Sequence, residues 1–308
     1  MKINDAVSMV LGKGSTLSDV EKEVERCKKM GVDLIPFGDE RYPRALSTIR
    51  EPPLLLYVWG KRCDAIDKFS IAIVGSRMAT SYGRSAAQKI SEELSRVGTV
   101  IVSGLAHGID SVAHSSAIKE GVTIGVLGTG IDIVYPESKR ELFERVKENG
   151  CIVSEFSLGT RPTKWTFPKR NRIIAGLSMG VVVVEASQKS GSLITARLAL
   201  EEGREVFAVP GSIFSETSEG TNYLIRQGAK CVSSGDDVLE EFGYIKKIEK
   251  KEIAKDPIIE ILKSGPKTFE EISFLLHTSI EELNVKLTML EVDGIISKDV
   301  SDKFKMNC

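Results

Sequence analysis

Short runs of β-branched residues recur through the middle of the chain, and each run ends close to a glycine or a serine. The runs lie at residues 71–74, 100–102, 123–127, 152–153, 181–184 and 206–209. Continuous apolar runs are typical of strands that are buried on both faces of a sheet. Amphipathic stretches near residues 82–96 and 109–120 alternate with these runs, which implies right-handed βαβ crossovers. We therefore predict an α/β domain over residues 66–243, with a Rossmann-like, doubly wound and mostly parallel sheet.

The regions on either side of this domain have different patterns. Residues 1–65 predict a small helical region, with helical spacing of apolar residues at 20–30 and a short strand or an extended segment at 54–59. Residues 244–256 are a charged linker. The last region, residues 257–308, contains three expected helices and two short expected strands, at 258–263, 268–275, 280–292, 295–298 and 303–306. This order of elements predicts a winged-helix domain.

The candidate recognition helix of that last domain has an unsuitable charge for reading DNA. Residues 279–294 hold four acidic residues against one lysine: Glu281, Glu282, Glu291, Asp293 and Lys286. Phosphates would repel this surface, whereas helices that read a groove present arginine, lysine, asparagine and glutamine. We expect the domain to contact a protein or to pack on its own chain.

Composition limits the possible classes of function. The formal net charge is −1 and the pI is about 6.4, so any nucleic-acid binding must use a focused basic patch. The five cysteines never form a CxxC pair, which is poor spacing for zinc and fits a reducing compartment. No signal peptide is recognised at the start, and apolar stretches such as 181–184 are too short to span a bilayer. We expect a cytoplasmic protein without membrane contact.

A basic segment that also carries aromatic residues points to the ligand. Residues 161–172 contain five cations and no acid: Arg161, Lys164, Lys169, Arg170 and Arg172. Trp165 and Phe167 stand among them. Cations hold phosphates while rings stack unpaired bases, so this mixture suits single-stranded nucleic acid. A solvated basic loop is the alternative interpretation.

Small residues follow the predicted strands, where a parallel sheet binds its ligands. The groups are Gly75-Ser76-Arg77, Ser103-Gly104 with Gly108, Gly128-Thr129-Gly130, and Ser190-Gly191-Ser192. Glycine lets a phosphate approach the backbone, and a helix that starts there offers free N–H groups. Turn formation explains any single group, but several on one sheet edge predict a row of anion sites.

Other kinds of site fit the sequence less well. The stretch from Gly128 to Ile133 has two of the three glycines of a dinucleotide fingerprint and follows a middle strand, so NAD binding is disfavoured. No P-loop sequence occurs. His107, Asp110 and His114 have helical spacing that a metal would accept, but they stand at a helix start, where capping and loop contacts are the favoured explanation. We expect no catalytic set, no metal and no cofactor.

Six stretches, in their order along the chain, resemble the DNA-processing protein A family (DprA, also called Smf). They are VGSRMATSYG (74–83), SGLAHGIDSVAH (103–114), GTGIDIVYP (128–136), FPKRNRIIAGLS (167–178), SGSLITA (190–196) and VPGSIFSETSEGTNYLIRQGA (209–229). Lys139 and Ser157 depart from the family pattern, which has asparagine and proline there. The resemblance implies an extended Rossmann fold, a homodimer, and a protein that binds single-stranded DNA and helps load a RecA-type recombinase in natural transformation. It implies no reaction of its own.

The same resemblance implies the site residues. Arg77 should clamp a phosphate, Phe167 should stack a base, and Lys164, Lys169, Arg170 and Arg172 should extend the basic groove. Asn171 and the small residues at the strand ends complete the predicted DNA site: Gly75, Ser76, Gly104, Gly108, Gly128, Ser190, Gly191 and Ser192.

An enzyme is the alternative, because the same fold branch includes LOG-type nucleotide 5'-monophosphate phosphoribohydrolases. Their signature, PGGxGTxxE, pairs a phosphate cradle with a catalytic glutamate. This chain has Pro210-Gly211-Ser212-Ile213 in place of the first part, and no acid follows Gly220-Thr221 at the required spacing.

Overall fold

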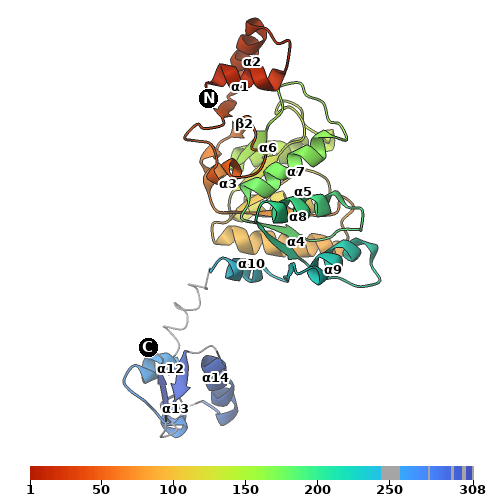
Figure 1. Ribbon diagram of the computed structural model, residues 1–308. Helices are drawn as coiled ribbons and strands as arrows, with labels where there is room; N and C mark the ends of the chain where they lie inside the picture. Colours follow the sequence, from red (N-terminus) through yellow and green to blue (C-terminus); the bar gives the residue numbers. More distant parts are fainter. Residues whose placement is uncertain (244–256, 277, 293–294, 300–302, 307–308) are drawn as a thin grey trace. The chain divides into compact units, whose positions relative to one another are not determined.

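The computed structural model describes residues 1–243, 257–276, 278–292, 295–299 and 303–306. The chain divides into two compact units, Met1–Phe242 and Gly243–Cys308 (Figure 1). The linker predicted at 244–256 lies outside the described residues.

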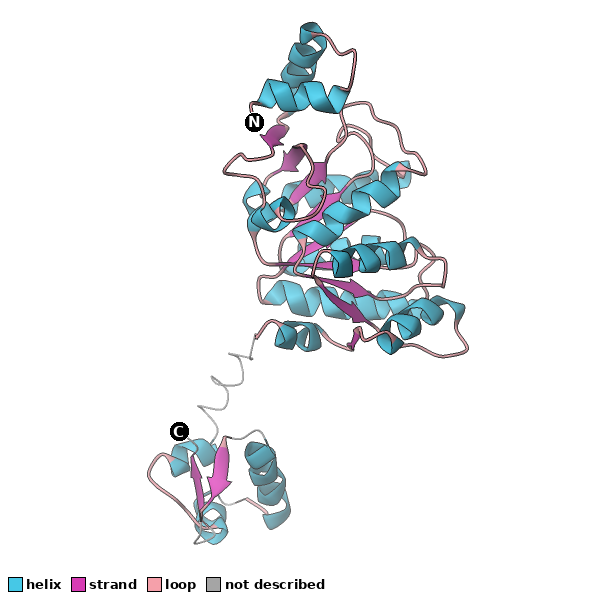
Figure 2. Ribbon diagram, viewed as in Figure 1, coloured by secondary structure: helices cyan, strands magenta, loops and turns pink. Residues whose placement is uncertain are grey.

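A single nine-stranded sheet forms the centre of the first unit (Figure 2). Its strands are β1 (Asp33–Pro36), β2 (Leu55–Gly60), β3 (Ser70–Val74), β4 (Val100–Ser103), β5 (Thr123–Val126), β6 (Cys151–Ser154), β7 (Gly180–Val183), β8 (Glu205–Ala208) and β9 (Lys230–Cys231). They lie in the order β1-β2-β6-β5-β4-β3-β7-β8-β9. The strands from β6 to β9 in this order are parallel. The predicted doubly wound sheet is therefore confirmed, and each of the six predicted strands is present.

The order of the strands reverses direction at β3. From β3 the chain adds β4, β5 and β6 on one side, and it then returns to add β7, β8 and β9 on the other side. In an open sheet of this kind, the loops that leave the two strands at the reversal diverge to opposite faces and leave a crevice between them. The crevice here is expected beyond the carboxyl ends of β3 and β7.

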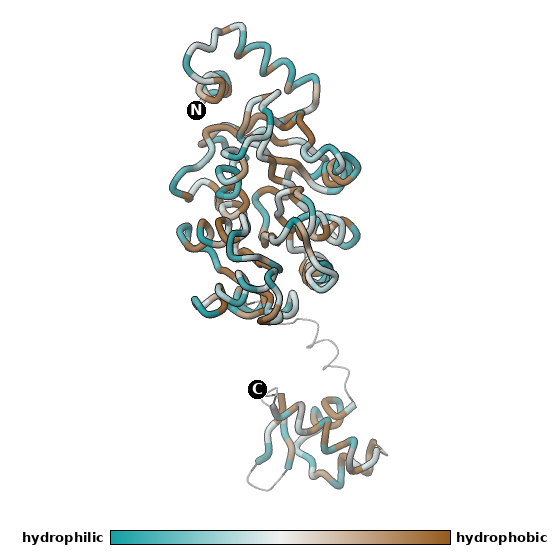
Figure 3. Tube along the Cα trace, turned by 90° about the vertical axis from the view of Figure 1, so that its right-hand side faces the viewer, coloured by the Kyte–Doolittle hydropathy of each residue, from teal (hydrophilic) through white to brown (hydrophobic). Residues whose placement is uncertain are grey.

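Helices cover both faces of the sheet because residues alternate between its faces. Ile71 and Ile73 of β3 belong to one core cluster, whereas Ala72 and Val74 belong to another. The cluster of Ile71 includes α4 (Ser81–Arg96), α5 (Ile109–Glu120) and α10 (Gly235–Glu241). The opposite cluster includes α3 (Arg44–Ser47), α7 (Thr166–Leu177), α8 (Gly191–Glu201) and α9 (Glu219–Arg226). In Figure 3, hydrophobic stretches of the trace lie mostly inside the first unit, and hydrophilic stretches lie mostly on its outside.

The amino-terminal region differs from the prediction. Residues 1–65 were expected as a separate small region, but β1 and β2 join the central sheet, and β2 pairs antiparallel with β6. The helices α1 (Ile3–Leu11), α2 (Leu17–Met30) and α6 (Arg140–Asn149) share one apolar cluster with these strands. The expected helical spacing at 20–30 is confirmed by α2, yet the boundary at residue 65 separates no compact unit.

The second unit has a core of its own. The helices α12 (Pro257–Leu262), α13 (Phe269–Leu276) and α14 (Ile280–Val292) are followed by the antiparallel strands β10 (Ile296–Lys298) and β11 (Phe304–Met306). Their apolar side chains form a separate cluster that includes Ile259, Leu283 and Phe304. The elements and their order agree with the prediction, and the winged-helix assignment stays a prediction. In the described ranges of both units, no helix is long and apolar enough to cross a membrane.

Candidate nucleic-acid interface

A cleft of about 650 Å³ lies where the strand order reverses. Its lining comes from the loops after β3, β4 and β7 and from the helices α7 and α8. The predicted site residues that line it are Gly75, Ser76, Arg77, Lys164, Phe167, Arg170, Asn171, Ser190, Gly191 and Ser192. The cleft thus joins segments that lie more than one hundred residues apart in the chain.

Arg77 stands on a tightly held loop at the rim of the cleft. The Ser76 N–H donates to the carbonyl oxygen of Glu185 at 2.8 Å, and the Ile109 N–H donates to the Ser76 carbonyl at 3.1 Å. Gly108 has φ +74°, and a Cβ atom there would lie 2.1 Å from the Ser76 oxygen. Only glycine therefore permits this packing of the loop against α5. The loop presents the exposed Arg77 guanidinium 5.5 Å from the centre of the Phe167 ring.

Phe167 begins the aromatic side of the cleft, one residue inside α7. Its ring is half-buried and packs 5.6 Å from the ring of Tyr135. A Cβ atom on Gly128 would lie 3.0 Å from the Phe167 ring, so Gly128 makes room for it. Beside it, the ammonium of Lys164 lies 5.0 Å from the ring of the exposed Trp165. The rim thus carries two pairs of a cation and an aromatic ring.

Arg170 lies on the floor of the cleft and is only 5% exposed. Its Nη1 donates to the carbonyl oxygens of Gly104, at 2.8 Å, and of Val126. A Cβ atom on Gly104 would lie 2.6 Å from this guanidinium. Burial lowers the pKa of Arg170 to about 10, which still leaves it charged at neutral pH. Asp110 supplies the opposite charge, and burial raises the pKa of its carboxyl.

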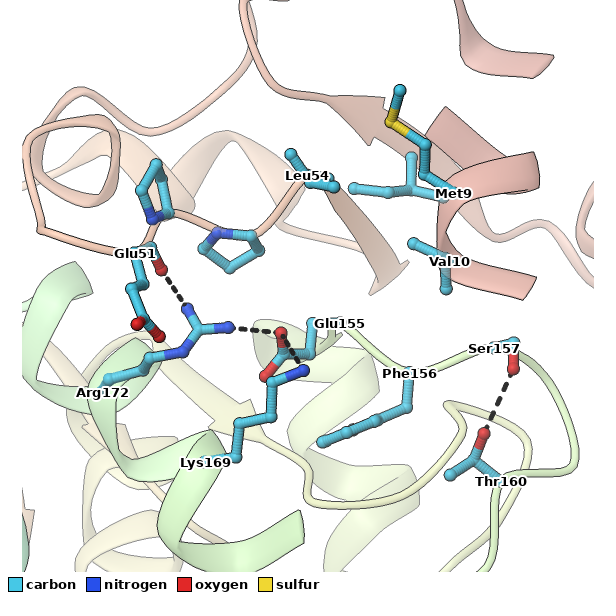
Figure 4. Close-up of a pocket in the computed structure, with 13 residues that line it drawn as sticks. Met9, Val10, Glu51, Leu54, Glu155, Phe156, Ser157, Thr160, Lys169 and Arg172 are labelled. Atoms are coloured by element: carbon cyan, nitrogen blue, oxygen red, sulfur yellow. Dashed lines mark hydrogen bonds and ion pairs between the residues drawn. The ribbon is translucent and has the colours of Figure 1, made fainter. Parts of the chain in front are cut away.

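The basic segment is not free of acid in the folded protein, which corrects the expectation from residues 161–172. Glu155 lies outside that segment and is 8% exposed. Its Oε2 accepts from Arg172 and lies 3.4 Å from the ammonium of Lys169. Lys169 and Arg172 face a second pocket, of about 390 Å³, which also includes Met9 (Figure 4). The two predicted groove residues therefore lie outside the cleft, and their contact with DNA stays a prediction.

The start of α8 forms the far wall of the cleft. The Ser190 side chain accepts from the Ser192 N–H at 3.3 Å, and so caps the helix. Asn171 of α7 donates from Nδ2 to the carbonyl oxygen of Gly191 at 3.4 Å. This bond links the two helices across the cleft.

Sequence reasoning missed several residues of the site. Ser187, Thr195, Glu216 and Thr217 also line the cleft. The last three lie in stretches that resemble the family, but the sequence did not assign them to the site. Glu185 follows β7 and is buried. Its carboxylate accepts from the Thr80 N–H at 2.9 Å and from the hydroxyls of Thr80 and Thr217, so it ties the loops after β3 and β8 together.

Two residues that were considered as metal ligands, Asp110 and His114, have other hydrogen-bond partners. Asp110 accepts from the N–H groups of Gly104 and Ala106, at 3.2 and 3.4 Å. His114 is fully buried, with Nδ1 2.7 Å from the hydroxyl oxygen of Thr123. Throughout the part of the chain that the structure describes, no group of three or more His, Cys, Asp or Glu side chains could hold a metal ion.

Comparisons with known proteins agree on one family. The model of the family described as DNA recombination-mediator protein A matches residues 33–243. The chain is 45% identical to the DNA processing protein DprA of Bacillus subtilis over 215 residues, which is 70% of this chain and 72% of that protein. It is 46% identical to the protein Smf of Escherichia coli over 213 residues, which is 68% of this chain and 57% of that protein.

Solved structures show the same relationship. The structure of DprA from Streptococcus pneumoniae matches with a TM-score of 0.67 and 39% identity, covering 78% of this chain and 87% of that one. The DNA processing protein A of Helicobacter pylori, described for its single-stranded DNA binding mode, matches with a TM-score of 0.62 and 30% identity. That match covers 68% of this chain and 95% of the Helicobacter chain.

Proposed function

Because the chain belongs to the DNA recombination-mediator protein A family, we propose that it binds single-stranded DNA in the cleft between β3 and β7 and passes it to a recombinase. The recombinase is of the RecA type, and the setting is natural transformation or another form of recombination. The protein acts in the cytoplasm as a homodimer and needs no cofactor. The Helicobacter pylori relative supports the choice of ligand, since its structure is described for single-stranded DNA binding.

One observation carries this proposal: Arg77 and Phe167 face each other at the point where the sheet order reverses. A phosphate held by the exposed guanidinium would place the neighbouring base within reach of the ring. Bases in a duplex are already stacked and paired, so the ring can be used fully only by an unpaired strand. Neither contact reads a base edge, and binding should therefore be nearly independent of sequence.

Burial and exposure support a different division of roles within the predicted site. Arg77 and Lys164 are exposed and contact phosphates, while Phe167 stacks a base. Arg170 is buried and bonded to main-chain carbonyls, so it holds the end of β5 against α7 rather than meeting the strand. Gly104 leaves space for Arg170, Gly108 for the loop that carries Arg77, and Gly128 for Phe167.

We propose no second function. The phosphoribohydrolase alternative needs a loop whose amides are free to cradle a phosphate. Here the Gly211 N–H donates to Oδ1 of Asn222 at 3.3 Å, and Nδ2 of Asn222 donates back to the Gly211 carbonyl at 3.0 Å. The amide that such a cradle would use is already bonded.

A salt titration with matched single-stranded and duplex DNA tests the proposal. We expect tighter binding of the single strand and little dependence on its sequence. With the two phosphate contacts of Arg77 and Lys164, a plot of log affinity against log salt should have a slope of about −1.4 or steeper for single strands. Equal affinity for the matched duplex, or an affinity independent of salt, would refute it.

A further inference from the structure

The second pocket, on the other side of α7, has the features of a ligand site that the proposed function does not use. Met9, Leu54 and the rings of Pro52 and Pro53 form its apolar side, and Phe156 lies opposite (Figure 4). Met9 is 59% exposed and Leu54 is 46% exposed, although both face the pocket. The half-buried Phe156 ring extends toward Lys169.

The charges in the pocket balance, which indicates what part of a ligand it can hold. Two acids and two bases line it, namely Glu51, Glu155, Lys169 and Arg172. Arg172 is committed to Glu155 and to the Glu51 carbonyl oxygen. A pocket without surplus positive charge would not compensate the loss of water around a phosphate. An uncharged, flat group between an aromatic ring and apolar side chains fits it better, and an unpaired base is such a group.

Lys169 connects this pocket with the rest of the basic segment. Its side chain is 56% exposed, and its ammonium lies 5.5 Å from the centre of the Phe156 ring. The same arrangement occurs at Lys164 with Trp165 and at Arg77 with Phe167. Three pairs of a cation and a ring therefore lie around the amino-terminal end of α7, from the cleft to the second pocket.

The helix α7 contributes lining residues to both cavities. Phe167, Arg170 and Asn171 of α7 face the cleft, while Lys169 and Arg172 face the second pocket. An α-helix with its side chains is about 10–12 Å wide. A strand that leaves the cleft past Trp165 thus meets the second pocket after crossing one helix end.

We infer that the pocket between α1 and α7 is a second nucleotide subsite, which stacks an unpaired base of the same strand on Phe156 while Lys169 contacts the adjoining phosphate. Trp165 stacks a base between the two cavities. This inference rests on the proposed function, because it extends the strand that the cleft holds.

Strand length separates this inference from the proposed function. Affinities are measured for oligothymidylates of about 4 to about 16 nucleotides, which cover the usual range of single-strand site sizes. Wild-type affinity should rise a second time once the strand reaches the second pocket. Phe156→Leu, which keeps apolar volume and removes the ring, should weaken the longest strands about fivefold or more and leave the shortest unchanged.

A second pair of variants guards against a folding effect at Phe156. Met9→Glu and Met9→Lys change the same exposed position, and only the glutamate should repel the strand and abolish the second rise. Tyr223→Leu is the control, because Tyr223 forms a similar pair with Arg226 on α9, at 5.8 Å. It should leave the length dependence unchanged.

The outcomes are distinct. If wild-type protein binds no single strand of any length, the proposed function fails. If it binds, but Phe156→Leu and Met9→Glu show the wild-type length dependence, the cleft remains the binding site and the second subsite is disproved.

Discussion

The rim and the floor of the cleft each contain an arginine, which is exposed to solvent at the rim and buried at the floor. Arg77 at the rim is exposed and lies beside the Phe167 ring, whereas Arg170 on the floor is 5% exposed and bonded to two carbonyl oxygens. Water stabilises the first charge, and the protein alone stabilises the second. A ligand phosphate can replace water at Arg77, but at Arg170 it would have to displace bonds that hold α7 to the sheet.

This difference shows that a basic motif does not by itself identify the groups that meet DNA. Arg77 and Arg170 both belong to stretches that resemble the family, and both were expected to contact phosphates. Under the proposed function, the exposed Arg77 would bind the strand, and the buried Arg170 would position the site. Substitutions should therefore separate stability from affinity.

The largest effect is expected on the floor. Asp110→Ala should lower the free energy of unfolding by about 3–5 kcal/mol, because it leaves the buried Arg170 without its opposite charge. It also leaves the N–H groups of Gly104 and Ala106 without their acceptor. Denaturant unfolding measures the loss.

Asp110→Asn is the control, since it removes the charge and keeps an acceptor. It should destabilise the protein less than Asp110→Ala. A change of less than about 0.5 kcal/mol in both variants is usual for surface positions, and it would show that Asp110 does not stabilise the floor of the cleft.

A second large loss of stability is expected at acid pH, and it comes from the buried His114 of α5. The Thr123 hydroxyl donates to the Ile101 carbonyl at 2.7 Å, so it accepts from Nδ1 of a neutral His114. Burial lowers the pKa of His114 from 6.5 to about 3. Between these values the unfolded chain binds a proton that the folded protein excludes. Stability that is present above pH 6.5 should thus fall by about 1.4 kcal/mol for each pH unit towards pH 3.

Unfolding midpoints from pH 7 to pH 4 test this effect, with His114→Gln as the comparison. The variant has no group that titrates there, so its midpoint should fall less steeply than that of the wild type. Parallel curves would show that other groups cause the acid sensitivity.

At the rim, affinity should change while stability does not. Phe167→Ala should weaken single-strand binding by about 1–3 kcal/mol with a nearly unchanged salt slope, because stacking releases no counterions. Arg77→Ala should reduce the magnitude of the slope by about 0.7, the contribution of one phosphate contact. Titrations at several salt concentrations measure both.

A similar change of slope in both variants would show that the assignment of the two roles is wrong. Unfolding of Phe167→Ala would instead place that ring in the core, and a melting curve for each variant decides this. Arg77→Ala changes an exposed side chain and should melt within a few degrees of the wild type.

The smallest effect is expected outside both regions, in the second unit. Deleting residues 257–308 should change single-strand affinity by no more than about threefold, which is about 0.7 kcal/mol. The chain from residue 244 onward holds 11 basic and 12 acidic residues, and this unit has a separate core. A folded truncation that loses tenfold or more in affinity would place the second unit on the DNA path.

The residues explain which parts of the structure could be predicted from sequence. The strands at 71–74 and 181–184 were predictable because each is a local run of β-branched residues. The role of Glu155 was not, because nothing in its neighbourhood shows that Arg172 lies against it. The same limit applies to β1 and β2. Their pairing with the sheet depends on partners far along the chain, whereas the two prolines before Leu54 indicate only an irregular segment.

The antiparallel contact between β2 and β6 also sets an order of events during synthesis. Tyr57 pairs with Ser154, so β2 has no neighbour on that side until the ribosome has added almost one hundred further residues. Until then β2 can pair only with β1, and an isolated two-stranded ribbon is at most marginally stable in water. The first helices share their apolar cluster with residues of β6 and α6. The amino-terminal region is therefore synthesised first but reaches its folded structure late. Until then Leu55 and Tyr57, which are fully buried in the folded protein, remain exposed to non-native contacts.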